Sequence, residues 1–444
     1  MKLIVVTDKH MGIGYKGKLP WNDKQELKLF KNITTGCTLV FGRKTLENLP
    51  FLKDRTIVGL TKNKGIDTSD WENQVILLDD LPEDNDANTF IAGGLDIYKK
   101  SFETLNYITE VHISIMKNTY DSDTFFDKKW LNDFVINEST EYETFIHYKM
   151  TKTNNGERQY LDLLEKVVKG QYRDTRNGVT ISTFGNQMNF DLRNGFPLLT
   201  TKKMFLRGII EEFLFFLRGD TDSTYLSNKK VKIWEGNTSK EFIEKCGLKY
   251  AEGVMGPMYG YQWRKFNAPY KIDDEGKPVD NDEKGVDQLQ QVIELIKNDP
   301  HSRRILMTTY NPEQAMEGVL FPCHSITIQF YVDGKYLDMF CYNRSQDVFL
   351  GTPFNIASSS LLLLVVAKLT NKIARNFIMS MGDTHIYTSH IECVHTQIKR
   401  LPHKFPNITI PEINSIDDIN NIKAADFILT NYNSNTAIKA KMIA

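Results

Sequence analysis

The pattern of apolar segments changes once along this chain, and that change limits what it can fold into. Up to about residue 150, short apolar runs alternate with amphipathic stretches such as Asp23–Ile33 and Leu95–Phe102. Such alternation predicts a largely parallel sheet with helices covering its faces. The runs expected to be strands are Lys2–Thr7, Thr38–Phe41, Thr56–Leu60, Val75–Leu78, Thr89–Ile91 and Val111–Met116.

A polar stretch at Thr151–Gly156 separates this pattern from a helix-rich second half. With 444 residues, the chain is long enough for two or three domains of roughly 150 residues each. We therefore predict one domain over residues 1–153 and a second over residues 154–444. Within the second, we expect helices at Phe205–Leu217, Val286–Lys297 and Asn355–Leu369, and strands at Arg304–Thr309, Ser325–Val332 and Lys335–Tyr342.

Charge and cysteine usage exclude several classes of protein. The 55 basic and 56 acidic residues give a net charge of −1, so a nucleic-acid partner is not expected. The longest apolar run, Leu361–Ala367, is far shorter than the roughly 20 residues of a membrane span. We expect it in a core helix and expect no membrane partner. The five scattered cysteines form no CxxC motif, which argues against a disulfide scaffold or metal module and favours a reducing, cytoplasmic location.

Glu26 is the first candidate for acid–base chemistry. It lies in the stretch Asp23–Ile33, next to the apolar residues Leu27 and Phe30. A carboxyl group on an apolar helix face has a raised pKa, which suits a general acid. The spacing alone fits equally a solvated charge on an exposed helix face.

Two turns in the first half are candidates for binding phosphate. Gly93–Gly94 follows a predicted strand and opens a predicted helix, where glycines let a pyrophosphate approach backbone N–H groups. The segment Gly42–Thr45 ends another strand with two cations and a hydroxyl group. Taken singly, the first fits a plain tight turn and the second a solvated loop.

Together these pieces resemble dihydrofolate reductase over residues 1 to about 150. The matching elements are Gly12–Gly14, Leu19–Trp21, Glu26 with Phe30, Phe41–Thr45, Arg55, Gly93–Gly94 with Tyr98, and Asp123–Phe126. The resemblance implies that Glu26 hydrogen-bonds the pterin and supports its protonation, that Phe30 lines the folate site, and that Arg55 holds the folate carboxylate. It implies an NADPH site made of Gly14, Arg43, Lys44, Thr45, Gly93, Gly94 and Tyr98. One departure is Ser114, which stands where Thr is common near the acid.

In the second half, the segment Pro322–His324 offers a candidate nucleophile, Cys323. A cysteine becomes a strong nucleophile where cations favour its thiolate. The same half contains Arg303–Arg304 and Arg344, and clustered guanidinium groups suit a phosphate dianion. Each feature alone also fits a simpler interpretation, a buried structural thiol or solvated surface charges.

Residues from about 157 to 444 resemble thymidylate synthase. The most specific match is Tyr342–Asn355 together with Pro322–His324. The other matches are Arg176, Phe196–Lys203, Glu212, Trp234 with Asn237, Gly256–Gly260 and Gly382–Tyr387. The resemblance implies that Cys323 adds to carbon 6 of dUMP and that carbon 5 then takes the methylene group of 5,10-methylenetetrahydrofolate.

The same resemblance implies roles for the surrounding residues. Glu212 would act through water on the proton transfers, Asn355 would read the uracil edge, and Tyr259 and His324 would form the wall behind the cysteine. Asp347, Trp234 and Asn237 would line the folate site. The dUMP phosphate and ribose would be bound by Arg176, Arg344, Ser345, His385 and Tyr387, with Arg303 and Arg304 supplied by a second subunit.

Nearly the whole chain thus resembles the bifunctional dihydrofolate reductase–thymidylate synthase family. The resemblance implies an α/β domain with a doubly wound, mostly parallel central sheet, followed by an α+β domain. It also implies NADPH and 5,10-methylenetetrahydrofolate as cofactor and co-substrate, dUMP and dihydrofolate as substrates, and a homodimer formed through the synthase domain. The alternative is a dUMP hydroxymethylase with a non-catalytic reductase-like domain.

Overall fold

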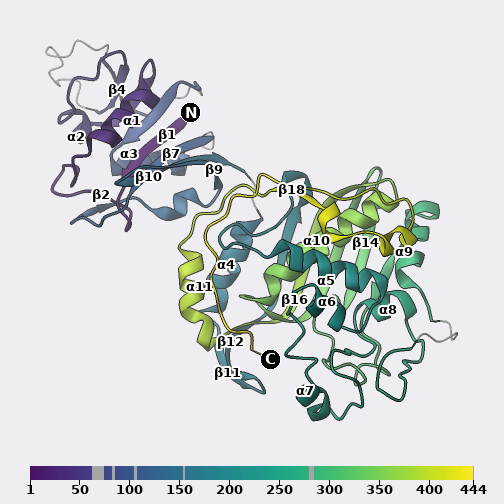
Figure 1. The fold of residues 1–444 in the computed structure, drawn as a ribbon. Coiled ribbons are helices and arrows are strands. Elements are labelled where there is room, and N and C mark those ends of the chain that lie inside the picture. Colours follow the sequence, from purple (N-terminus) through teal and green to yellow (C-terminus); the bar gives the residue numbers. More distant parts are fainter. Residues whose placement is uncertain (63–74, 83–85, 105–107, 154–155, 280–284, 444) are drawn as a thin grey trace. The chain divides into compact units, whose positions relative to one another are not determined.

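The computed structural model describes residues 1–62, 75–82, 86–104, 108–153, 156–279 and 285–443. The chain divides into two compact units, Met1–Asn155 and Gly156–Ala444 (Figure 1). The predicted domain boundary between residues 153 and 154 falls at positions 154–155, which lie outside the described residues.

The first unit is built on an eight-stranded sheet in the order β5-β4-β3-β6-β1-β7-β10-β9. The strands from β5 to β7 pair in parallel, and β10 and β9 are added antiparallel at one edge. This confirms the doubly wound, mostly parallel sheet. The sheet strands are β1 (Lys2–Thr7), β3 (Thr38–Gly42), β4 (Thr56–Leu60), β5 (Val75–Leu78), β6 (Thr89–Gly93), β7 (Glu110–Met116), β9 (Phe134–Glu141) and β10 (Phe145–Lys152).

Short elements at the ends of these strands complete the first unit. The helices are α1 (Lys24–Thr34), α2 (Arg43–Leu46) and α3 (Leu95–Thr104), and a separate two-stranded pair consists of β2 (Gly12–Gly14) and β8 (Thr124–Phe125). The side chain of Asp23 caps α1 by accepting hydrogen bonds from the backbone N–H groups of Gln25 and Glu26. Strands β9 and β10 are not predicted from the sequence, because their exposed residues mask the apolar alternation.

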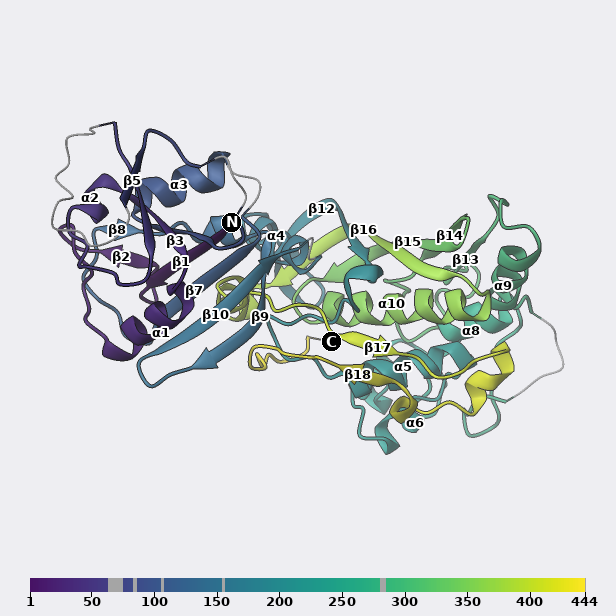
Figure 2. The same ribbon diagram turned by 90° about the horizontal axis from the view of Figure 1, so that it is seen from above.

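The second unit is α+β, with a six-stranded sheet in the order β11-β12-β16-β15-β14-β13. Only the central β15–β16 pair is parallel. Helix α10 (Gly351–Leu369) contacts both of these strands on one face of the sheet, and α5 (Leu206–Arg218) contacts α10 (Figure 2). The strands are β11 (Gln171–Thr175), β12 (Gly178–Asp191), β13 (Leu306–Thr308), β14 (Thr327–Asp333), β15 (Tyr336–Asp347) and β16 (Ile373–Tyr387).

The remaining elements of the second unit surround this core. They are α4 (Glu157–Val167), α6 (Thr224–Asn228), α7 (Lys240–Lys245), α8 (Gly260–Lys265), α9 (Gln288–Asn298), α11 (Ile391–Ile398), and the pair β17 (Asn407–Thr409) and β18 (Ile428–Thr430). Helix α10 is long and apolar enough by composition to cross a membrane, but most of its residues are buried within this unit. The prediction of a core helix around Leu361–Ala367 is confirmed.

Candidate active sites

The first candidate site centres on Glu26, one turn into α1. Its side chain is buried, with 7% exposed, on the same helix face as Phe30 and Thr34. Leu27, expected as an apolar neighbour, is instead about half exposed. Burial, reinforced by the charge of Asp23, raises the pKa of Glu26 to about 7, against an opposing hydrogen bond from Ser114. The structure thus contradicts the interpretation of Glu26 as a solvated charge.

Arg55 lies at the other end of α1. Its guanidinium donates hydrogen bonds to the Thr34 hydroxyl at 3.0 Å, the Lys31 carbonyl at 3.1 Å and the Lys53 carbonyl at 2.6 Å. Burial lowers the pKa of Arg55. The side chain is therefore held in one orientation next to the helix that carries Glu26 and Phe30, as a folate-binding group requires.

The turn after β6 forms a cradle lined by two glycines. Gly93 has φ +121°, and a Cβ atom there would lie 3.2 Å from the Tyr98 hydroxyl. A Cβ atom on Gly94 would lie 3.1 Å from the Thr45 hydroxyl. The Tyr98 hydroxyl in turn donates to the Ile4 carbonyl at 2.8 Å. Four predicted NADPH residues therefore meet at one point, with the open backbone that a diphosphate needs.

The other predicted NADPH residues lie around this cradle or apart from it. Arg43 and Lys44 are exposed on α2, and Arg43 pairs with Glu47 at 3.1 Å. Gly14 lies on β2, where its carbonyl accepts a hydrogen bond from the Asp123 backbone N–H. The cradle and the cations of α2 fit a dinucleotide phosphate, whereas Gly14 belongs to the separate β2–β8 pair.

The second candidate site centres on Cys323. The Cys323 carbonyl accepts hydrogen bonds from the backbone N–H groups of Arg344 at 2.9 Å and Ser345 at 3.2 Å, so β15 holds this loop. The Arg344 guanidinium donates to the Pro322 carbonyl at 2.9 Å. Its charge favours the thiolate, yet burial outweighs it and raises the pKa of Cys323. The expected activation by cations is thus incomplete within this chain alone.

Two aromatic rings form the wall behind the cysteine. The Tyr259 hydroxyl lies 3.3 Å from Cys323 Sγ, and the Tyr259 ring stacks on His324 at 4.1 Å between centroids. Burial lowers the pKa of His324 to about 4, so this imidazole is neutral at neutral pH. The predicted group of Cys323, Tyr259 and His324 is therefore assembled, with the histidine neutral.

Glu212, on α5, is the buried acid of the second unit. Its side chain is 8% exposed, and its Oε1 accepts a hydrogen bond from Trp234 Nε1 at 2.8 Å. Burial raises the pKa of Glu212 to about 7, although the Trp234 bond opposes that shift. Asn237 follows in the same turn, with its backbone N–H bonded to the Trp234 carbonyl. The three residues predicted as acid and folate contacts therefore form one cluster.

Asn355, in the first turns of α10, is oriented by a residue that the sequence reasoning missed. Its Nδ2 donates to Gln346 Oε1 at 3.1 Å, and the Thr352 hydroxyl donates to the same oxygen at 3.0 Å. These bonds fix which end of the Asn355 amide is the donor. Gln346 is 2% exposed. Its position directly after Arg344 and Ser345 is the feature of the sequence that could have identified it.

The parallel register of β15 and β16 brings further predicted residues together. Ser345 lies opposite Asp383 and Asp347 opposite His385, and His385 Nδ1 lies 2.8 Å from Asp383 Oδ1. The Tyr387 ring contacts the His385 ring. Burial and the charge of Asp347 raise the pKa of Tyr387, and the charge of Arg176, from the β11–β12 turn, lowers it. Arg303 and Arg304 lie apart, exposed before β13, and within the described parts of the chain neither forms an ion pair.

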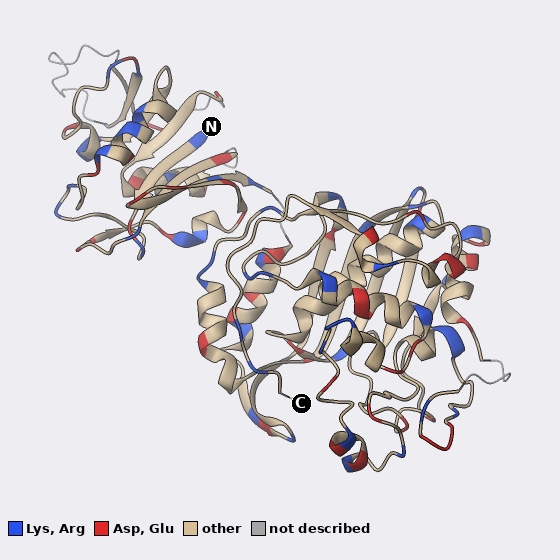
Figure 3. Ribbon diagram, viewed as in Figure 1, with Lys and Arg blue, Asp and Glu red and all other residues tan. Residues whose placement is uncertain are grey.

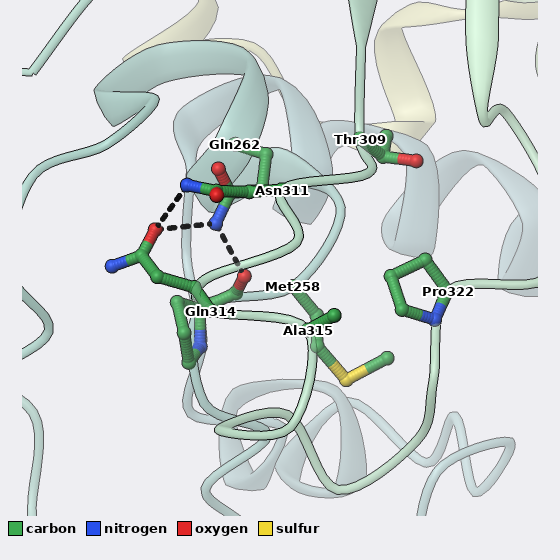
Figure 4. Close-up of a pocket in the computed structure, with 8 residues that line it drawn as sticks. Met258, Gln262, Thr309, Asn311, Gln314, Ala315 and Pro322 are labelled. Carbon is green, nitrogen blue, oxygen red and sulfur yellow. Dashed lines mark hydrogen bonds between the residues drawn. The ribbon is translucent and has the colours of Figure 1, made fainter.

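A small pocket lies beneath the cysteine loop (Figure 4). The Gln314 Oε1 atom accepts hydrogen bonds from Gln262 Nε2 and Asn311 Nδ2, both at 3.0 Å, and Pro322 borders the pocket opposite these amides. The pocket has no room for a nucleotide. We interpret it as the buried support of the segment that ends at Cys323.

Each unit thus has its own buried acid. The second unit also has a cysteine and arginine side chains of the kind that bind phosphate. Together these features define an enzyme with two separate sites. A family model described as dihydrofolate reductase matches residues 1–154, and one described as thymidylate synthase matches residues 158–444. The chain belongs to the bifunctional dihydrofolate reductase–thymidylate synthase family. It is both an NADPH-dependent oxidoreductase and a methyltransferase that uses 5,10-methylenetetrahydrofolate.

Named relatives match over the full length of the chain. A "Bifunctional dihydrofolate reductase-thymidylate synthase" of Paramecium tetraurelia is 39% identical, covering 99% of this chain and 98% of the relative. Proteins of the same description from Arabidopsis thaliana and Leishmania major are 35% and 34% identical, covering 99% of this chain and 95% and 94% of those relatives. These comparisons give no support to the hydroxymethylase alternative.

Proposed function

We propose that Cys323 is the nucleophile of the synthase reaction. Its thiolate adds to carbon 6 of dUMP, and carbon 5 then attacks the methylene group and loses its proton. The tetrahydrofolate leaves carbon 5's new methylene group and gives it a hydride, which makes the methyl group of dTMP and leaves dihydrofolate, and the sulfur departs from carbon 6. Tyr259, in contact with Cys323 Sγ, and Glu212, with its raised pKa, supply and accept protons at that site. The assembly of Cys323, Tyr259 and His324 is the observation that carries this proposal.

We propose that Asn355 selects uracil through the amide orientation that Gln346 imposes. With one Nδ2 hydrogen bonded to Gln346, Oδ1 and the second N–H face a base that offers a ring N–H and a carbonyl. Gln346→Ala should raise the KM for dUMP by about tenfold, the worth of roughly one buried hydrogen bond. Dihydrofolate reduction by the same chain is the internal control, and an unchanged KM would contradict the role of Gln346.

For the first unit, we propose that Glu26 supports protonation of the pterin, with Phe30 against the ring and Arg55 on the folate carboxylate. Gly93, Gly94, Tyr98 and Thr45 would hold NADPH at the turn after β6, and Arg43 and Lys44 would add charge there. When bound, NADPH supplies the hydride. The buried position and raised pKa of Glu26 support this assignment.

A single coupled assay tests both sets of roles. The protein is given dUMP, 5,10-methylenetetrahydrofolate and NADPH, and dTMP and NADPH are followed together. We expect Cys323→Ser to abolish dTMP formation while reduction of added dihydrofolate continues. We expect Glu26→Ala to abolish NADPH oxidation while dTMP still forms. Loss of both activities in either variant would contradict the assignment of one site to each unit.

We propose a homodimer formed through the outer face of the second unit's sheet. Within the described residues, α10 covers one face, while the other presents large side chains such as Phe184, 79% exposed, and Tyr331, 66% exposed. The unpaired Arg303 and Arg304 would reach the partner's phosphate site, which supplies the cations that Cys323 lacks in one chain. Charges of both signs are interspersed along both units (Figure 3).

Subunit mixing tests the shared site. Cys323→Ser and Arg304→Ala chains, each impaired alone, are unfolded, mixed and refolded together. Half of the random dimers then contain one complete site, so about a quarter of the wild-type synthase activity should return. No recovery, or a monomer in sedimentation, would contradict the proposal.

We also propose a cytoplasmic location, which the five free thiols support; a fluorescent fusion of the chain would test it.

A further inference from the structure

A line of buried polar side chains leads from Glu26 along one face of the sheet of the first unit. Ser114 on β7 hydrogen-bonds Glu26, and its hydroxyl lies 3.2 Å from His147 Nδ1 on β10. His147 Nε2 lies 3.2 Å from His112 Nδ1, and His112 Nε2 lies 2.9 Å from Glu110 Oε1. Glu26, Ser114, His147 and His112 are all less than 9% exposed, whereas the Glu110 side chain reaches solvent, with 17% exposed.

The chemistry of these groups allows the chain of hydrogen bonds to run in only two directions. A hydroxyl group and a neutral imidazole each have one donor hydrogen and one acceptor on this path. With a proton on Glu26, every donor points away from Glu26 and His112 donates to the Glu110 carboxylate. With a proton on Glu110, every donor points the opposite way, toward Glu26. If both carboxyl groups are ionised, two acceptors face each other without a proton along the chain.

We propose that Ser114, His147, His112 and Glu110 form a proton relay that returns a proton from solvent to Glu26 between turnovers. The proposal rests on the reductase activity of the family. Protonated Glu110 gives its proton to His112 Nε2, His112 gives its Nδ1 proton to His147 Nε2, His147 gives its Nδ1 proton to Ser114, and Ser114 gives its proton to Glu26. Four protons move by one bond each, and the net result is one proton carried from Glu110 to Glu26.

The surroundings of the two histidines favour a relay in which both imidazole rings stay neutral. Burial lowers the pKa of His147 to about 4 and also lowers the pKa of His112, so both rings are neutral at neutral pH. The Phe90 ring of β6 packs edge-on against His112. The charged groups facing the relay are Lys2 of β1 and Lys149 of β10, at 3.3 Å and 3.7 Å from Glu110, Glu138 of β9, and Asp23 at the start of α1. Tyr98 of α3 is a further titratable neighbour of Glu26.

The first test uses two carboxylates that share one neighbour. Glu110 and Glu138 both contact Lys149, at 3.7 Å and 3.4 Å, but only Glu110 contacts His112. The full-length chain is preincubated below the Glu26 pKa of about 7, then mixed with dihydrofolate and NADPH at about pH 8 in a stopped-flow instrument. The first turnover should match the wild type in Glu110→Gln and in Glu138→Gln. Steady-state turnover should fall about tenfold in Glu110→Gln only, with KM unchanged.

A second pair of variants separates relay from support. His147→Gln keeps a donor and an acceptor between Ser114 and His112 but cannot pass a proton, whereas His147→Phe removes both bonds. We expect equal losses of steady-state reduction in the two variants, with the KM for dihydrofolate unchanged as the control for folding of the first unit. The proposal is overturned if His147→Gln restores the wild-type rate, or if Glu110→Gln behaves as Glu138→Gln does.

Discussion

The two units of this enzyme each contain a buried glutamic acid, but the hydrogen-bonding partners of the two acids differ. Glu26 and Glu212 are both buried, and burial is the main cause that raises the pKa of each to about 7. Glu26 interacts with the hydroxyl of Ser114, a group that both donates and accepts, and a line of polar groups continues from Ser114 to solvent. Glu212 bonds the indole N–H of Trp234, which can only donate.

This difference shows that an acid's pKa does not determine its supply of protons. Trp234 cannot accept a proton from elsewhere and pass it on, so Glu212 has no proton route through this bond. Glu26 has a second connection along one face of the sheet. In the synthase, the reacting nucleotide itself gains and loses protons at the site, whereas reduction of dihydrofolate consumes one proton in each turnover.

The largest test of the comparison removes each acid in turn. Glu212→Gln should reduce dTMP formation by about a thousandfold, and Glu26→Gln should reduce dihydrofolate reduction by about a hundredfold or more, because general acid–base groups contribute effects of this size. Each variant should keep the other unit's activity. Parallel assays of both reactions check this, and a variant that impairs both activities would show that the two sites are not independent.

A second test uses stability, in which both acids should act with the same sign. A carboxyl group with a folded-state pKa of about 7 and an ordinary value of 4.5 holds its proton longer in the folded state, so stability falls as pH rises between these values. Ionisation of each acid then lowers the free energy of unfolding by about 3 kcal/mol above pH 7. Glu26→Gln and Glu212→Gln should therefore be more stable than the wild type at pH 8 and no more stable at pH 4.

Denaturant unfolding at the two pH values, with separate probes for the two units, measures these differences. The matched comparison is the same variant at pH 4, where both wild-type carboxyl groups are protonated in the folded state and mostly protonated in the unfolded state. Equal differences at both pH values would mean that packing, and not ionisation, sets the effect.

The smallest test changes the hydrogen-bond donor of each acid. Ser114 and Trp234 each lower the pKa of their acid by bonding its ionised form. Ser114→Ala and Trp234→Phe should therefore raise those pKa values, by up to about one unit each. The pH profiles of the two activities would record both shifts. Only Ser114→Ala should also slow steady-state turnover, because only Ser114 belongs to a relay; equal behaviour of the two variants would remove the contrast.

Sequence reasoning indicated the proposed reacting groups more readily than the groups proposed to position them. Glu26, Cys323 and Glu212 lie in short, distinctive segments, so pattern and resemblance both point to them. Gln346 and His147 act on Asn355 and Ser114 respectively, and those contacts exist only once the chain has folded. The net effect on the pKa of Cys323 could not be read from the sequence, because Arg344 was visible there but the extent of burial was not.

The order of residues alone determined the alternation of strands and helices, the change of pattern near residue 150, and the identity of the chemical groups. These properties depend on side-chain type and local spacing, which are present in the unfolded chain. The tertiary structure decided which groups lose water and which become neighbours. A pKa near 7 in two carboxyl groups, the antiparallel pairing that places His147 beside Ser114, and the cradle of Gly93 and Gly94 all depend on desolvation and register. Both are set only when segments distant in sequence pack together.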